Sequence, residues 1–182
     1  MPRAVVAIAP DGRPVASFAD RLLAFLIDTA VLAGVNIVLL IPTMIAIFVV
    51  IAGAASKVQT DPVTGEVTSS PSAGVLIGVP LLIELGYVLL TFVAAYVYYV
   101  EMFGRTGVTW GKRAMKLQLI RAAAPAAPID RGVLVKRWAV QFPAGLVLPF
   151  FSWVDGLWQL WDKPYQQCLH DKAAGTIVVK VG

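Results

Sequence analysis

One long apolar run near the N-terminus constrains the fold of this chain more than any other feature. Residues 22–55 contain a single charged side chain, Asp28. As one helix the run would extend roughly 50 Å, whereas the hydrocarbon core of a bilayer is about 30 Å thick. No core helix of a soluble protein needs such a run. The run therefore predicts a membrane-spanning helix that tilts, kinks at Pro42 or projects beyond the bilayer.

The composition also indicates a membrane protein. Of the 182 residues, 58% are hydrophobic and 14% are charged, whereas soluble domains average about 25% charged residues. A single cysteine, Cys168, excludes an intrachain disulfide. Because the chain also has only one histidine, the usual zinc-binding sets are out of reach. We expect neither a metal nor a cofactor.

Charge in the loops predicts the orientation of the chain. A second apolar run, residues 74–103, follows a polar loop at residues 56–73. Residues 104–137 then hold eight basic side chains and one acidic side chain, Asp130. By the positive-inside rule this basic segment is expected in the cytoplasm, the loop outside, and the N-terminal segment, residues 1–18, inside.

A third hydrophobic region, residues 138–162, is too short for two full spans and contains prolines and glycines. It either crosses once or enters, breaks near Pro149 and returns, because irregular backbone at membrane depth is tolerated where protein or water surrounds it. The returning path keeps the tail, residues 163–182, in the cytoplasm. There its GTIVVKV segment would pair as a strand with AMKLQLIR, residues 114–121.

The predicted fold is therefore one all-α membrane domain over residues 1–182. It is a helical bundle with two long transmembrane helices, at residues 19–55 and 74–103. The broken or re-entrant third region and a small cytoplasmic strand pair complete it.

Three blocks, in this order, resemble the RDD family of small bacterial membrane proteins. They are ADRLLAFLIDTAVL at residues 19–32, RTGVTWGKRAMKLQLI at 105–120 and LHDKAAGTIVV at 169–179. The resemblance implies a multi-pass protein of the bacterial inner membrane. It also implies transport of unidentified ligands, and some members of the family look like sodium/proton antiporters.

The family is named for one arginine and two aspartates. Arg21 and Asp28 match the arginine at the start of the first helix and the aspartate inside it. The second aspartate is either Asp171, in LHDKAAGT, or Asp155.

Five side chains are candidates for ligand or ion binding: Arg21, Asp28, Glu84, Asp155 and Asp171. Arg21 and Asp28 share a helical stripe, about 10 Å apart along the axis. They form either a cation or proton site or an ion pair that holds the first helix against its neighbours, with Lys112 or Lys172 as a further partner.

The other carboxyl groups have different surroundings in the sequence. No cation lies near Glu84, so it is either a neutral packing residue, a proton or sodium site, or a contact with a partner subunit. Folding the two long helices about the loop places Asp28 near Tyr98 and Glu101. Three tryptophans beside Asp155 predict a solvated position at the membrane interface. His170 has no convincing partner in the sequence.

Two functions of different classes follow. The first is a small polytopic protein that transports cations, protons or an unidentified small ligand, with Arg21, Asp28 and Asp171 in a cytoplasm-facing polar cluster. The second is a non-catalytic accessory subunit that packs through Glu84 and small residues against a larger membrane complex.

Expected partners follow from the same features. They are the lipid bilayer, a larger membrane complex or a second copy of the chain, and anionic headgroups near Lys112, Arg113 and Lys116. We expect no nucleic acid, because the basic segment is explained by topology. No catalytic triad or nucleophile motif is present, so we expect no enzyme.

Overall fold

The computed structural model describes residues 7–148 and 150–182 of the chain. These residues form two compact units. Unit 1 contains the described residues up to Val31 together with Ala95–Gly182, and unit 2 contains Leu32–Ala94.

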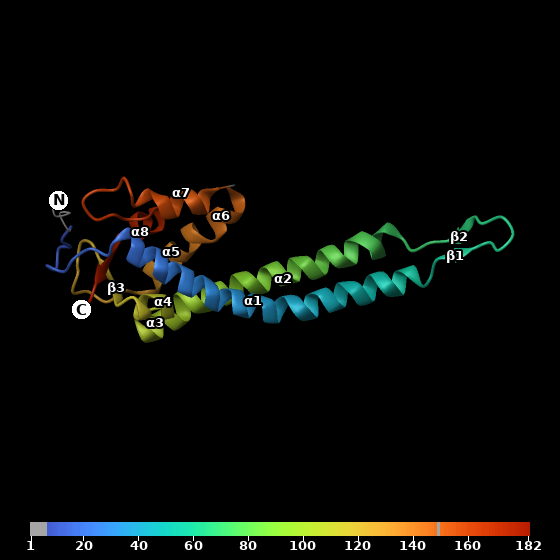
Figure 1. The fold of residues 1–182 in the computed structure, drawn as a ribbon, viewed down its shortest axis with the longest axis horizontal. Helices are drawn as coiled ribbons and strands as arrows, with labels where there is room; N and C mark the ends of the chain where they lie inside the picture. Colours follow the sequence, from blue (N-terminus) through green and yellow to red (C-terminus); the bar gives the residue numbers. More distant parts are fainter. Residues whose placement is uncertain (1–6, 149) are drawn as a thin grey trace. The chain divides into compact units, whose positions relative to one another are not determined.

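Unit 2 is built from two long apolar helices that run side by side and from the loop between them (Figure 1). The first helix, α1, extends over Phe18–Ala55 and begins in unit 1. A π-helical turn, η1 (Gly74–Gly78), leads into α2 (Val79–Tyr96). The loop carries an antiparallel pair of very short strands, β1 (Gln59–Thr60) and β2 (Val67–Ser69).

The surface of these helices is apolar. Large side chains such as Phe48, which is 70% exposed, and Leu82 point outward from α1 and α2. Such a surface is stable against hydrocarbon, not against water. Two helical stretches of the described residues, Phe18–Ala55 and Gly74–Thr106, are long and apolar enough to cross a membrane. The two long apolar helices predicted from the sequence are thus confirmed.

Polar side chains within these helices make their hydrogen bonds inside unit 2. Asn36 Nδ2 donates to the carbonyl oxygen of Leu32 at 2.9 Å, and Thr43 Oγ1 donates to that of Leu39 at 2.8 Å. The Tyr87 hydroxyl donates to Asn36 Oδ1 at 3.4 Å and so links α2 to α1. These bonds lower the cost of polar groups in an apolar environment.

Unit 1 combines a two-stranded antiparallel sheet with short helices. In the sheet, β3 (Leu117–Arg121) pairs with β4 (Thr176–Lys180) so that Leu119 lies opposite Val178. This is the strand pair predicted from AMKLQLIR and GTIVVKV. The N-terminal segment adds one bridge, from Val15 to Val179.

The second long helix ends in unit 1, and shorter helices follow. A π-helical segment, η2 (Val97–Met102), continues α2 and leads into α3 (Phe103–Thr106). These include α4 (Trp110–Ala114), α5 (Arg131–Gln141) and α8 (Leu169–Ala174).

Side-chain caps set the beginnings of α4 and α5. Thr109 Oγ1 accepts from the backbone N–H of Lys112, and Asp130 Oδ1 accepts from that of Val133. Both caps follow irregular backbone, so the local sequence decides where these helices begin.

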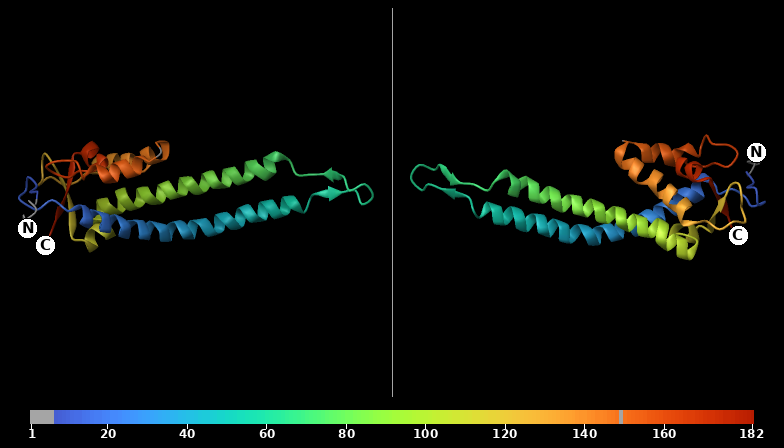
Figure 2. Two further views of the ribbon diagram at one scale, coloured as in Figure 1. Left: turned by 45° about the horizontal axis from the view of Figure 1, so that its top comes forward. Right: turned by 180° about the vertical axis from the view of Figure 1, so that it is seen from behind.

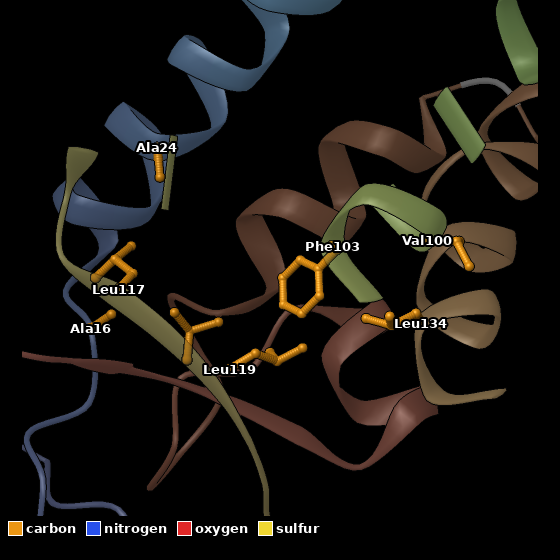
Figure 3. Packing of buried hydrophobic residues seen from close by; sticks show 8 residues of the cluster. Ala16, Ala24, Val100, Phe103, Leu117, Leu119 and Leu134 are labelled. Atoms are coloured by element: carbon orange, nitrogen blue, oxygen red, sulfur yellow. The ribbon is translucent and has the colours of Figure 1, made fainter. Parts of the chain in front are cut away.

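The core of unit 1 lies between the sheet and the helices. Phe103 packs among Leu117 and Leu119 of β3 and Leu134 of α5 (Figure 3). Ala24 brings the beginning of α1 into the same cluster. This core therefore joins segments from both ends of the chain.

Two short helices occupy the third hydrophobic region, α6 (Pro143–Val147) and α7 (Phe151–Trp158), shown from two further sides in Figure 2. At 1.5 Å per residue, neither helix can cross a core about 30 Å thick. Pro149, where a break was predicted, lies outside the described residues. The two separate helices favour the broken path over a single span.

Candidate functional site: a buried charge cluster in unit 1

Arg21 pairs with Asp171. Its Nη1 lies 3.0 Å from Asp171 Oδ2, and both side chains are buried. The guanidinium group of Arg21 also donates to the carbonyl oxygens of Ala16, at 3.3 Å, and Val178, at 3.4 Å. A direct Arg21–Asp28 pair, suggested by their shared stripe, is therefore wrong. Helical side chains lean toward the N-terminus, which carries Arg21 away from Asp28.

A second arginine completes the surroundings of Asp171. Arg137 of α5 contacts Asp171 Oδ1 through Nη1, which also donates to the hydroxyl of Thr176. Asp171 Oδ2 accepts from the backbone N–H of Cys168 at 3.1 Å, at the beginning of α8. Burial raises the pKa of Asp171, but the charge of Arg137, with those of His170 and Arg21, outweighs burial and holds this pKa well below its ordinary value.

Asp28 is bound by hydrogen-bond donors of the chain that follows the second long helix. The Tyr98 hydroxyl donates to Asp28 Oδ1 at 2.5 Å, and the Thr109 hydroxyl donates to Oδ2 at 2.7 Å. The backbone N–H of Gly111 donates to Oδ1 at 2.7 Å. Asp28 is only 1% exposed, yet it forms no ion pair with any residue that the structure describes. The predicted proximity of Asp28 to Tyr98 is thus confirmed, whereas Glu101, the other predicted neighbour, pairs with Arg131.

Gly111 is required by the close approach of α4 to α1. A Cβ at this position would lie 2.0 Å from the carbonyl oxygen of Ala24 and 2.8 Å from Asp28 Oδ1. No side chain fits that space. Thr109 and Gly111 therefore bind Asp28 together. Thr109 caps α4 and donates its hydroxyl to Asp28, and Gly111 donates its backbone N–H.

Asp155 and His170 form a second polar pair. His170 Nδ1 lies 2.7 Å from Asp155 Oδ2, and the His170 backbone N–H donates to Asp155 Oδ1 at 2.8 Å. His170 Nε2 lies 3.7 Å from Asp171 Oδ1, which connects the pair to the arginines. Asp155 is only 3% exposed. Two predictions are wrong here: Asp155 is not solvated, and His170 has partners. The reason is that α7 turns its polar side toward α8.

Glu84 is not part of this cluster. It belongs to unit 2, whereas Arg21, Asp28, Asp155 and Asp171 belong to unit 1. Its side chain is exposed on α2 and has no hydrogen bond or ion pair with any other residue in the described ranges.

The cluster surrounds a cavity of about 510 Å³ in unit 1. The charged side chains Arg21, Asp28 and Arg137 line it, together with apolar ones from α1, α5 and α7. Lys112 also lines the cavity, with Nζ 6.0 Å from the centre of the Phe103 ring and no ion pair among the described residues. Burial, together with the nearby charge of Arg137, lowers the pKa of Lys112 to about 8.

Three possible metal ligands lie close together in the same cluster. One atom each of Cys168, His170 and Asp171 lies within 4.8 Å of the others. Two guanidinium groups already occupy Asp171, and burial, with the charge of Asp171, raises the pKa of Cys168 to about 12. Because a metal binds the thiolate, these residues are a poor set for a metal ion.

Sequence reasoning missed several of these residues. In the sequence Arg137 is one basic residue of the segment 104–137, although in the structure it binds Asp171. Thr109 and Gly111 lie inside the block at residues 105–120 that carries the family resemblance. That block could have indicated that these two residues belong to the site.

The fold and the cluster define a membrane protein whose charged side chains are gathered in a compact unit at the beginning of an apolar helix. The RDD family model matches residues 15–175, and the chain belongs to the RDD family. The matched residues include Arg21, Asp28, Asp155 and Asp171. Comparisons with curated proteins and with solved structures gave no match.

Proposed function

We propose that this protein is a small polytopic protein of the bacterial inner membrane that transports cations or protons through a site at Asp28. One observation carries the proposal. Asp28 is a buried carboxylate that lines the unit 1 cavity and forms no ion pair with any of the described residues. An ionisable group in a membrane-spanning helix is costly, which favours a functional role for it.

The chemistry around Asp28 suits a hard cation or a proton. The hydroxyl oxygens of Tyr98 and Thr109 lie within 2.7 Å of the carboxylate, and oxygen ligands are those that hard cations bind. A proton would neutralise the same carboxylate. A sodium ion and a proton each change the charge at Asp28 by one unit, so one can exchange for the other at a single site.

The arginines have a supporting role in this proposal. Arg21 and Arg137 bind Asp171 and hold α1, α5 and α8 together around the cavity. The protein is proposed to have no catalytic activity, and the site is proposed to work without a cofactor.

The proposed orientation places unit 1 on the cytoplasmic side. The basic charge of residues 104–137 supports it through the positive-inside rule. Arg113 and Lys116 are exposed and are proposed to contact anionic headgroups. Reporter fusions after Thr64 and after Gly182 test this orientation, with the first expected outside and the second inside.

Flux measurement tests the transport proposal. The purified protein in proteoliposomes is expected to exchange sodium for protons. Asp28→Asn is expected to reduce this flux to the level of empty vesicles. Glu66→Gln is the matched control, because Glu66 is an exposed carboxyl group in the loop of unit 2. Absence of flux in the unmodified protein, or equal flux in Asp28→Asn, would contradict transport through Asp28.

A second function, an accessory subunit of a larger membrane complex, is favoured by Glu84. An exposed carboxyl group on an apolar helix costs several kcal/mol in lipid unless it is protonated or contacts a partner. Purification in mild detergent is expected to retain one stoichiometric partner, which is a larger complex or a second copy of this chain. Glu84→Leu should release that partner, whereas Leu85→Ala, a change at a neighbour that is also exposed, should not. Retention in Glu84→Leu would count against this function.

A further inference from the structure

The segment that contains α6 and α7 turns apolar side chains outward and acidic side chains inward. Large apolar side chains point outward from this region, with Phe150 79% exposed and Trp153 71% exposed. Three polar residues of the same region, Asp155, Gln159 and Asp162, are buried. A soluble protein places its apolar side inward, so this region is built to contact an apolar environment.

Contacts with α8 prevent these acidic side chains from turning outward. Asp155 is held by His170, and Asp162 Oδ1 lies 2.5 Å from Nζ of Lys172. Both partners belong to α8, which continues into the sheet through β4. If α7 rotated to bury its tryptophans, both contacts with α8 would break. The acidic side chains would then lie on the apolar surface without partners.

We propose that α6 and α7 lie in the interfacial layer of one leaflet and anchor unit 1 to the bilayer without crossing it. The occupant of the apolar surface is lipid. Leu22 and Phe25 of α1, which are exposed in unit 1, border the same cavity as Trp153 and Leu157 of α7. Because α1 is long and apolar enough to span the membrane, the lipid around it continues directly onto α7.

Composition and length support an interfacial position. Tryptophan prefers the layer between hydrocarbon and headgroups, and Trp153, Trp158 and Trp161 all belong to this region. Helices of 5 and 8 residues cover about 8 Å and 12 Å, far less than the thickness of the core. A short helix with apolar residues on one side lies in the interface plane.

The strand pair gives an independent argument. The chain leaves β3, passes through α5, α6 and α7, and returns to pair with β3 through β4. All of these elements belong to unit 1. A single crossing between the paired strands would place them on opposite sides of the membrane. The number of crossings between β3 and β4 must therefore be even, and in this proposal it is zero.

Depth measurement by electron paramagnetic resonance tests the anchor. Nitroxide labels are placed on cysteines introduced one at a time at Phe150, Trp153 and Leu157 of the full chain, with the buried Cys168 left in place. The labelled protein is reconstituted in vesicles of phosphatidylcholine and phosphatidylglycerol. Control labels replace Phe48, which is exposed on an apolar helix, and Val63, which is exposed in the polar loop.

Accessibility to oxygen and to a water-soluble nickel chelate then gives the depth of each label. We expect all three test labels at one shallow depth, about 5–10 Å below the headgroup boundary, with more oxygen and less nickel contact than at position 63. Three results would overturn the anchor: depths that progress toward the bilayer centre, nickel contact equal to that at position 63, or exclusion of both reagents, which would show protein and not lipid on this surface.

Native tryptophan fluorescence provides a second measurement that needs no label. Brominated lipids quench tryptophans that touch the acyl chains. We expect the Trp153→Phe/Trp161→Phe variant to lose most of the quenchable signal, and Trp138→Phe, at a residue packed against the core, to lose little. Quenching unchanged by the double substitution would overturn the anchor. The result does not depend on transport, so it is independent of the proposed function.

Discussion

Arg21 donates to the carboxylate of Asp171 across 150 residues of sequence, with 3.0 Å between Nη1 and Oδ2. The bond joins the beginning of α1 to the beginning of α8, and Arg137 binds the other carboxylate oxygen. One acid therefore holds two arginines, and three helices meet at a single buried carboxylate. This arrangement leaves Asp28 to be bound by hydroxyl and backbone donors alone.

Removal of Asp171 should cost more stability than removal of Arg21. Asp171→Asn leaves two buried guanidinium groups without a counter-charge, whereas Arg21→Gln leaves Asp171 paired with Arg137. Loss of one partner from a buried pair costs about 3–5 kcal/mol. We expect Asp171→Asn to reach that range and Arg21→Gln to stay below it in reversible unfolding of the detergent-solubilised protein. Equal losses would show that Arg137 does not compensate.

Gly111→Ala should weaken the contact between α1 and α4. The new Cβ would lie 2.0 Å from the carbonyl oxygen of Ala24, so α4 must move and its hydrogen bond to Asp28 lengthens. Overpacking of this kind costs about 1–3 kcal/mol. Gly104→Ala is the matched control, because its nearest neighbour, Leu134 Cδ1, lies at an ordinary 3.8 Å. Equal melting temperatures for the two variants would contradict the close approach.

Stability should rise with pH in the range where Lys112 titrates. The pKa of Lys112 is about 8 in the folded protein instead of the ordinary 10.5. Between these values the unfolded chain binds more protons, so the free energy of unfolding increases as pH increases from 8 to 10.5. Lys112→Met should remove this part of the pH dependence and raise stability at neutral pH. A pH profile identical to that of the unmodified protein would refute the assignment.

The lowered pKa of Asp171 predicts that the protein loses stability in acid. Its pKa lies below the ordinary value in the folded protein, so the stability it contributes is complete above the unfolded pKa of about 3.9 and is lost as pH falls below that value. We expect no contribution from Asp171 to the pH dependence near neutrality. Asp171→Asn should therefore flatten the acid limb of the stability profile. Because the charge of Asp171 also raises the pKa of Lys112, the same variant should move the alkaline limb to lower pH.

His170 and Asp155 should be energetically coupled. His170→Leu leaves the Asp155 carboxylate buried without its partner, whereas the double variant His170→Leu/Asp155→Leu removes both polar groups. Residues in one buried network typically show coupling of about 0.5–3 kcal/mol in a double-mutant cycle. Additive losses would show that the 2.7 Å contact between them contributes nothing to stability.

Much of the local structure was predictable. The apolar runs predicted both long helices, and alternation in AMKLQLIR and GTIVVKV predicted the paired strands. The surroundings of Asp155 were not predictable in the same way. Tryptophans beside an acid usually indicate the solvated interface, but here the acid points inward and the tryptophans outward. Which side of a short helix faces inward depends on its tertiary partners, here His170 of α8.

The sequence by itself determined that this chain belongs in a membrane, because the length and polarity of an apolar run are local properties. The blocks around Arg21, Thr109 and Asp171 likewise carried the family membership. Only the tertiary structure decided which charges meet. Arg21 and Asp28 share a stripe of α1, but the direction of a helical side chain and the return of the chain through β4 bring Arg21 to Asp171 and Asp28 to Thr109. Contacts across 150 and 81 residues depend on how the whole of unit 1 packs.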